Sequence, residues 1–215
     1  MVEIIGKSNS VFNQFIAEIR DETVQKDRMR FRRNIERIGE VMAYEISKKL
    51  PFETKEVGTP LGIASMQLPS EQPVIATILR AGLPLHYGIL NYFDQADNSF
   101  ISAYRKHHKD GSFEIKLEYL SSPKLDNRIL ILTDPMLATG ASLVLTYKAL
   151  LAKGKPIHTH IACVIASTEG INYAKKNLPS DVTIWVGAVD EELTAHGYIV
   201  PGLGDAGDLA FGLKE

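Results

Sequence analysis

The first 50 residues carry apolar side chains at three- and four-residue spacings, with polar residues between them. The apolar positions are Phe12, Phe15, Ile16, Ile19, Phe31, Ile35, Ile38 and Met42. This spacing is typical of helices that bury one face. It predicts a helical amino-terminal part over about residues 8–50, which Pro51 ends.

From residue 74 onward the pattern changes to short β-branched runs that alternate with helical stretches. Strands are predicted at 74–79, 129–133, 158–166 and 182–189, and helices at 83–93, 143–153 and 169–177. Alternation of this kind is typical of a mostly parallel sheet with helices on both faces. We therefore expect an α/β fold with an open, twisted, mostly parallel sheet.

Two further segments are predicted to turn or to project from this sheet. The apolar runs at 100–104 and 113–117 flank a polar tip at 107–111, which indicates a protruding β-arm over about residues 99–120. Residues 59–62 (TPLG) have the composition of a turn before the first buried strand.

Length and charge narrow the classes of function. The 215 residues suffice for one main domain, expected to span 1–215. With 24 basic and 26 acidic residues the net charge is -2, which gives no general attraction to nucleic acid or to an anionic membrane. The single Cys163 cannot form an internal disulfide, and the chain shows no signal pattern and no apolar stretch of about 20 residues. These features favour a cytoplasmic protein without a nucleic-acid or membrane partner.

The stretch between the predicted strand at 129–133 and the next helix has the composition of a phosphate-binding loop. Ligands of open α/β sheets bind beyond the carboxyl ends of the strands, where a helix amino terminus offers N–H groups to an anion. Thr139 and Ser142 supply hydroxyls, and Gly140 allows close approach of the backbone. Asp134 is suited to accept hydrogen bonds from sugar hydroxyls. The alternative is a turn in which Thr139 or Ser142 only caps the helix.

The carboxy-terminal segment, residues 190–212, shows neither a helical nor a strand period. It holds five glycines and one proline, together with apolar residues that a surface loop would not need: Tyr198, Ile199, Val200, Leu203 and Phe211. We expect an irregular backbone that folds over a pocket and offers main-chain groups to a flat polar ligand. The alternative is a packing or disordered tail.

Three motifs together resemble the uracil phosphoribosyltransferase family. They are ILRAGL at 78–83, DPMLATG at 134–140 and GYIVPGLGDAGD at 197–208, and weaker likeness covers nearly the whole chain. The resemblance implies a phosphoribosyltransferase-like fold and an enzyme that makes UMP and pyrophosphate from uracil and phosphoribosyl pyrophosphate (PRPP). It also implies a homodimer or higher homo-oligomer.

The resemblance implies roles for the residues that match these motifs. Asp134, Arg80 and Arg105 would be catalytic, with Asp134 on the ribose hydroxyls and both arginines on pyrophosphate. PRPP would contact Arg80, Arg105, Asp134, Pro135, Met136, Leu137, Ala138, Thr139, Gly140, Ala141, Ser142 and Asp205, and uracil would contact Ile199, Gly204, Asp205 and Ala206. The cofactor would be Mg²⁺ carried by pyrophosphate, without a metal site built from protein ligands.

The chain departs from the family pattern at two places. Ala141 stands where most members have glycine, and residues 113–123 (FEIKLEYLSSP) replace the usual sequence of the arm after Arg105. Two other functions remain open: a phosphoribosyltransferase for another base, and a weak or silent regulator with this fold that senses PRPP or a nucleotide. The arginines at 28, 30, 32 and 33 are interpreted as a solvated helix face paired with Glu36 and Glu40.

Overall fold

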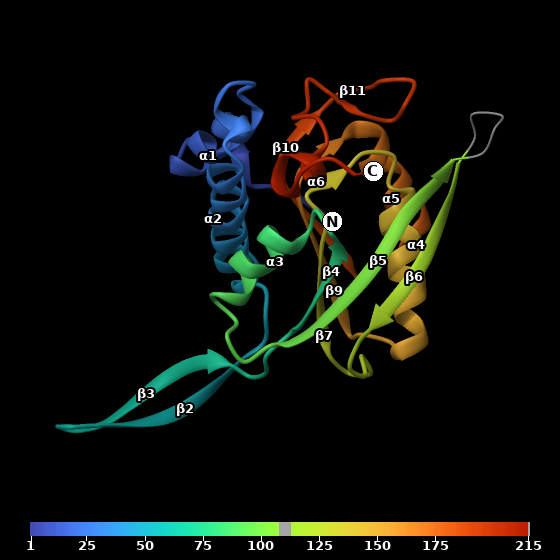
Figure 1. The fold of residues 1–215 in the computed structure, drawn as a ribbon. Helices are drawn as coiled ribbons and strands as arrows, with labels where there is room; N and C mark the ends of the chain where they lie inside the picture. The colour runs from blue at the N-terminus through green and yellow to red at the C-terminus, as the bar shows by residue number, and fades with distance from the viewer. Residues whose placement is uncertain (108–112, 215) are drawn as a thin grey trace.

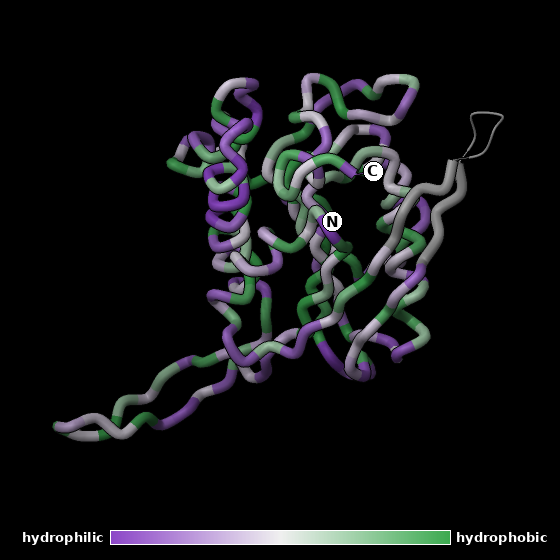
Figure 2. Tube along the Cα trace, viewed as in Figure 1, coloured by the Kyte–Doolittle hydropathy of each residue, from purple (hydrophilic) through white to green (hydrophobic). Residues whose placement is uncertain are grey.

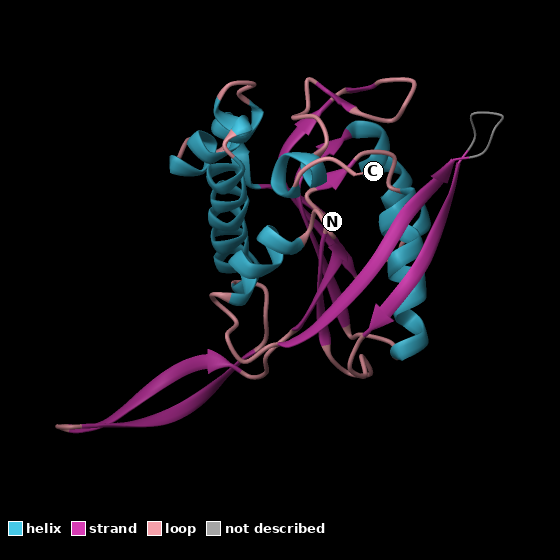
Figure 3. Ribbon diagram, viewed as in Figure 1, coloured by secondary structure: helices cyan, strands magenta, loops and turns pink. Residues whose placement is uncertain are grey.

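A central sheet with helices on both faces forms the body of the protein in a computed structural model (Figure 3). The structure describes residues 1–107 and 113–214, and for 103–107 and 113–117 it describes the backbone only. Within the described residues no helix has both the length and the apolar character that crossing a bilayer requires.

The sheet is mostly parallel, as the sequence predicts. Its strands are β1 (Val2–Ile4), β4 (Val74–Leu79), β5 (Asp97–His107), β6 (Phe113–Ser121), β7 (Ile129–Thr133), β8 (Met136–Leu137), β9 (His158–Ser167) and β10 (Val182–Asp190). Their order is β1-β10-β9-β7-β4-β5-β6, with β8 beside β9, and all pairs are parallel except β5 with β6. This arrangement confirms the predicted fold class.

Alternate strand residues face two separate helical layers. On one face lie α1 (Val11–Arg20), α2 (Arg28–Ser47) and α3 (Leu83–Leu90), packed on side chains such as Ile75 and Ile131. On the other lie α4 (Ala141–Leu150) and α5 (Thr168–Asn177), packed on Val74 and Leu130. Short 3₁₀ helices are η1 (Ile5–Lys7), η2 (Val24–Lys26) and η3 (Leu151–Lys153). Figure 2 shows the apolar residues concentrated along the central strands.

Helices α2 and α3 touch through their backbones. A Cβ added at Gly39 would lie 2.6 Å from the Leu85 carbonyl oxygen and 3.1 Å from the Gly88 Cα, and one added at Gly88 would meet the Glu36 carbonyl. Any side chain at either position would force the helices apart. The two glycines therefore fix where α3 lies, and with it the turn at Arg80–Gly82 that precedes α3.

Two hairpins extend from the body in different directions (Figure 1). The arm of β5 and β6 is the one predicted from the sequence, although residues 108–112 of its expected tip lie outside the described residues. The second hairpin, β2 (Phe52–Thr59) and β3 (Gly62–Pro69), was not predicted, except for its turn at 59–62. All of β2 is exposed, so its strands carry no buried stripe that could have indicated them.

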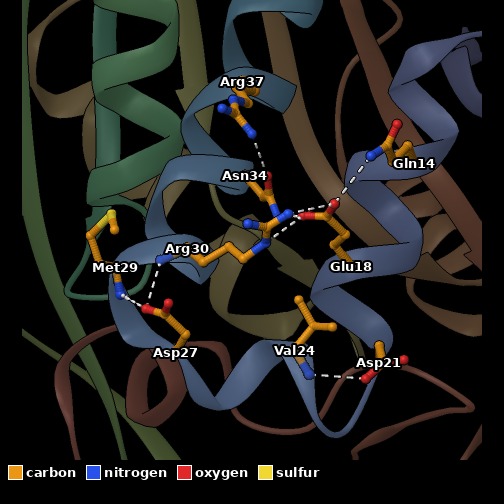
Figure 4. Close-up of polar contacts among 9 residues, drawn as sticks. All are labelled: Gln14, Glu18, Asp21, Val24, Asp27, Met29, Arg30, Asn34 and Arg37. Carbon is orange, nitrogen blue, oxygen red and sulfur yellow. Dashed lines mark hydrogen bonds and ion pairs between the residues drawn. The ribbon is translucent and has the colours of Figure 1, made fainter.

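Arg30 and Arg33 of α2 pair with different carboxylates. Arg33 pairs with Glu36 at 2.8 Å and with Glu40 at 3.5 Å, as predicted. Arg30 instead reaches Glu18 of α1 through two hydrogen bonds of 3.0 Å, and Asn34 donates a third of 2.7 Å (Figure 4). Hydrogen bonding from Arg30, followed by that from Asn34, lowers the pKa of Glu18 to about 2.

Candidate active site

The predicted site residues gather at the carboxyl ends of the central strands. Strands β4 and β7 are parallel neighbours, so Arg80 directly after β4 and Asp134 directly after β7 lie at the same sheet edge. The carboxy-terminal segment lies above this edge (Figure 1), and its buried Ile199 and Ala206 share a core cluster with Met136 and Ala138. The fold thus brings all three sequence motifs together.

The loop after β7 encloses a small polar cavity of about 120 Å³. The cavity is lined by Asp134, Met136, Leu137, Ala138, Thr139, Gly140, Ser142 and Leu143. Gly140 precedes α4 with a φ of 78°, a left-handed conformation that favours glycine. Because the N-terminus of α4 opens beside the cavity, its N–H groups and partial positive charge suit a phosphate.

The helix-cap alternative for this loop does not fit the geometry. The N-cap of α4 is Gly140, and no side chain caps the helix there. Ser142 lies one residue inside the helix, and the Thr139 hydroxyl accepts only a long hydrogen bond of 3.5 Å from the Ala141 amide. Ala141 is the first residue of α4, so its additional methyl group sits on ordinary helical backbone.

Helix α5 supports the loop from behind, through two residues that sequence analysis did not identify. Ser167 caps α5 by accepting a hydrogen bond of 2.8 Å from the Gly170 amide, and its hydroxyl donates to the Ala138 carbonyl. A side chain at Gly170 would collide with that carbonyl and with the carbonyl of Leu137. The sequence signal was present, because Ser167 stands just before the predicted helix and serine is a preferred N-cap residue.

Asp134 lies at the entrance to the loop. Its amide donates to the Ala162 carbonyl of β9 at 3.1 Å, and its Oδ1 accepts a hydrogen bond of 3.3 Å from the Met136 amide. These contacts hold the backbone of Asp134 in register with the sheet. The carboxylate is a lining group of the cavity.

The carboxy-terminal segment is more regular than predicted. It contains the short strands β11 (Glu192–Leu193) and β12 (Ile199–Val200), which pair with each other, and helix α6 (Ala206–Phe211). The expectation of an irregular backbone was therefore wrong over 206–211. Asp205 caps α6 by accepting the Asp208 amide at 3.0 Å, and glycines on both sides hid the helical period.

A partly buried ion pair anchors this segment to α1. Both terminal nitrogens of Arg20 lie 2.8 Å from the carboxylate oxygens of Asp190. Arg20 also donates to the Gly202 carbonyl at 3.0 Å, and the Gly202 amide donates to Asp190 at 2.9 Å. Sequence analysis missed this arrangement because its members are far apart in the chain.

The proposed uracil contacts differ in exposure. Ile199 and Ala206 are buried, whereas Gly204 is exposed with a φ of 94° and Asp205 is half-buried. Burial opposes ionisation of Asp205, but hydrogen bonds from the Asp208 amide and from Lys214 outweigh it and lower its pKa. Asp205 therefore offers a carboxylate at neutral pH beside main-chain groups of a glycine-rich turn.

Arg80 is already engaged by the carboxy-terminal segment. Its Nη2 lies 2.9 Å from Asp208 Oδ1 and also donates to the Gly212 carbonyl. Arg105 lies on β5 opposite Ile115 of β6, three residues beyond Ser102, the partner of the last residue of β4. Strand β5 therefore runs beyond the end of β4, and Arg105 lies in this extension. The side chain of Arg105 lies outside the described part of the structure.

The donor set near the loop fits a cation that arrives with phosphate oxygens. Among the residues whose side chains are described, no three His, Cys, Asp or Glu side chains come together as a metal cage. Asp134, Asp205 and Asp208 are the carboxylates of the assembled motifs. Hard oxygen donors of this kind, few in number, suit Mg²⁺ that retains phosphate and water ligands.

Two known proteins with sequences similar to this chain carry one and the same name. A protein from Porphyromonas gingivalis named uracil phosphoribosyltransferase is 55% identical over 210 residues, covering 98% of this chain and 97% of its own. One of the same name from Methanothermobacter thermautotrophicus is 40% identical and covers 85% of this chain and 83% of its own.

Solved structures agree at the level of the fold. A protein from Aquifex aeolicus superimposes with a TM-score of 0.87 at 30% identity, covering 99% of both chains. A hypoxanthine phosphoribosyltransferase from Staphylococcus aureus has a TM-score of 0.51 at 15% identity over 74% of each chain, which shows a shared fold alone. The model of the family described as uracil phosphoribosyltransferase matches residues 7–213. The chain belongs to the uracil phosphoribosyltransferase family.

Proposed function

We propose that this protein transfers the 5-phosphoribosyl group of PRPP to N1 of uracil, forming UMP and pyrophosphate. The observation that carries the proposal is that a polar cavity at the α4 N-terminus lies beside a carboxy-terminal segment that packs on the same loop and offers main-chain groups. Family membership over residues 7–213 supports it.

The phosphate loop would bind the 5′-phosphate of PRPP, which takes no part in the reaction. Ala138, Thr139, Gly140 and Ser142 line the cavity, and their amides, with the hydroxyls of Thr139 and Ser142, would hold the 5′-phosphate. Asp134 would accept hydrogen bonds from the ribose hydroxyls. Together these contacts would fix the anomeric carbon in position, so that the reaction becomes effectively unimolecular.

The arginines would act where charge develops. The bond from C1′ to pyrophosphate breaks while a bond from C1′ to uracil N1 forms, and the proton of N1 is lost. Positive charge builds on the ribose and negative charge on the leaving group, as in other glycosyl transfers. Arg80 and Arg105 would stabilise the leaving pyrophosphate, and Mg²⁺ bound to it would supply further positive charge.

The carboxy-terminal segment would read the base. Uracil presents an N–H donor between two carbonyl acceptors, and the backbone from Ile199 to Ala206 can match this pattern with its own N–H and C=O groups. Cytosine carries an amino donor where uracil has an acceptor. Such a mismatch leaves a buried group unpaired, at a cost of about 1–3 kcal/mol per group.

The proposal is tested by measuring nucleotide and pyrophosphate formation from PRPP and Mg²⁺ with uracil, cytosine, hypoxanthine or adenine. Of the four bases, only uracil should support turnover. Turnover with another base would contradict the assignment of uracil to residues 199–206. No turnover with any base, together with tight and salt-sensitive binding to pyrimidine-operon leader RNA, would indicate a regulator instead.

We also propose that the protein assembles as a homo-oligomer through the β2–β3 hairpin. Leu61 is fully exposed, Ile63 is 73% exposed, and Phe52, Val57 and Met66 are exposed as well. By the strand register, Phe52 and Ile63 lie on one face of the hairpin and Val57 and Met66 on the other. An isolated two-stranded hairpin is marginally stable, and apolar residues exposed together usually mark an interface. Light scattering should give a dimer or larger for the wild type and a smaller species for Ile63→Glu. A monomeric wild type would contradict the assembly.

A further inference from the structure

The side chain of Arg80 is held from one side. Both of its hydrogen bonds within the described residues use Nη2, one to Asp208 Oδ1 at 2.9 Å and one to the Gly212 carbonyl. The other two nitrogens, Nε and Nη1, are not used by these contacts. The side chain is 36% exposed, so a ligand can reach it without unfolding of the segment.

Asp208 is itself fixed by its surroundings. It lies in the first turn of α6, and its amide donates to Asp205 Oδ1 at 3.0 Å. Lys214 Nζ lies 3.1 Å from Asp205 Oδ2 and 3.9 Å from Asp208 Oδ1. A continuous set of polar contacts therefore runs from Asp205, at the proposed base site, through Asp208 to Arg80, at the proposed pyrophosphate site.

We propose that Asp208 is a positioning residue that holds Arg80 in the orientation that receives pyrophosphate, and thereby joins the base-binding segment to the leaving-group site. This inference rests on the proposed function. A free arginine samples many rotamers, and ordering it when the ligand binds costs conformational entropy. Because Asp208 and the Gly212 carbonyl already hold Nη2 before the ligand binds, less entropy is lost on binding. Nη1 and Nε can then donate to phosphate oxygens.

The experiment compares Asp208→Asn with the wild type by calorimetric titration of pyrophosphate with Mg²⁺, by titration of UMP, and by steady-state kinetics. Pyrophosphate affinity and kcat/KM for PRPP should each fall about tenfold, the size expected for one charge-assisted hydrogen bond. UMP affinity should stay within about twofold, because UMP carries no leaving group. A variant that merely loosened α6 would lose affinity for both ligands.

A matched control removes a carboxylate from a comparable ion pair far from the site. Asp97 Oδ2 lies 3.0 Å from Arg128 Nη1, between the start of β5 and the residue before β7, at the opposite end of these strands. Asp97→Asn should leave pyrophosphate affinity and kcat/KM unchanged. Asp208→Glu keeps the charge and should restore part of the lost affinity, and it serves as the test variant if Asp208→Asn does not fold.

The double variant decides whether Asp208 acts through Arg80. In an Arg80→Ala background, Asp208→Asn should cause no further loss of pyrophosphate affinity. The inference is overturned if the second substitution costs as much in that background as in the wild type, or if Asp208→Asn alone leaves pyrophosphate binding unchanged or tighter. Since pyrophosphate binding needs no base, these results stay separate from the test of uracil turnover.

Discussion

Arg20 and Asp190 form an ion pair between residues 170 positions apart, with both terminal guanidinium nitrogens 2.8 Å from the carboxylate oxygens. The pair joins the end of α1 to the end of β10, and both members also contact the backbone of Gly202. It therefore determines where the carboxy-terminal segment begins its path over the sheet edge. The stability of the body and the geometry of the proposed base site depend on the same two side chains.

Loss of this ion pair should be costly. The Asp190 side chain is only 8% exposed and that of Arg20 22%, so Asp190→Asn leaves a largely buried guanidinium without its counter-charge. We expect a loss of about 3 kcal/mol in the free energy of unfolding, measured with urea, and a higher KM for uracil. Lys48→Met, which breaks an exposed pair with Glu45, should cost less than about 1 kcal/mol. Equal losses for both variants would contradict this account.

Gly170→Ala should damage the phosphate loop from behind. The new methyl would collide with the carbonyls of Leu137 and Ala138, and relief of the clash should cost about 1–3 kcal/mol and displace the loop. We expect a lower melting temperature and a raised KM for PRPP. At Gly58 an added Cβ meets nothing within 4 Å and lies far from the loop, so Gly58→Ala should leave the KM for PRPP near the wild-type value. An unchanged KM for Gly170→Ala would show that the loop does not depend on α5.

Asp134→Asn tests the proposed ribose contact. The change keeps the shape of the side chain but replaces one acceptor oxygen with a donor group, so it should fold normally and lower kcat by about 100-fold or more. Circular dichroism and thermal unfolding check the fold, and single-turnover kinetics measure the chemical step. Activity equal to the wild type would remove Asp134 from the mechanism.

The Glu18 contacts should make stability depend on acid pH. Because the folded-state pKa is lowered from 4.5 to about 2, the folded protein favours the ionised form, and the contribution is fully present above about pH 5. It is lost as pH falls through 4.5 toward 2. Arg30 is half exposed, so solvent screening limits the contribution to about 1 kcal/mol.

The variant Glu18→Gln isolates this effect. It should be about 1 kcal/mol less stable than the wild type at pH 7, and the difference should shrink at pH 3, where the wild-type carboxyl loses part of its charge advantage. Urea unfolding at the two pH values measures both quantities. A difference that stayed constant with pH would mean that packing, and not charge, supports the contact between α1 and α2.

The sequence predicted those parts of the fold that depend on local pattern. Strands such as Val74–Leu79 and Ile129–Thr133 have the predicted limits because a doubly buried strand is a continuous apolar run bounded by polar turns. Helix α4 began two residues earlier than predicted, because Ala141 and Ser142 are not apolar and the periodic signal starts at Leu143.

The features that were not predicted either depend on contacts between distant parts of the chain or lack a buried face. The β2–β3 hairpin has no buried face, and α6 is six residues long between glycines, so neither has a period to detect. The motifs include Arg80, Asp134 and Asp208, but they do not show which of these residues contact one another. The contact partners of Asp190, Ser167 and Asp208 lie far away in the sequence, at Arg20, Ala138 and Arg80. Such pairings become visible only in the three-dimensional structure.

The glycine contact between α2 and α3 has a mechanical consequence. Helices that touch through side chains can shift relative to each other by changing rotamers, but α2 and α3 touch through their backbones at Gly39 and Gly88, so this adjustment is closed to them there. Helix α2 leads through residues 48–51 into the exposed hairpin, and α3 is preceded by the turn that contains Gly82 and Arg80. The position of Arg80 therefore depends on the same helix pair that leads into the exposed hairpin.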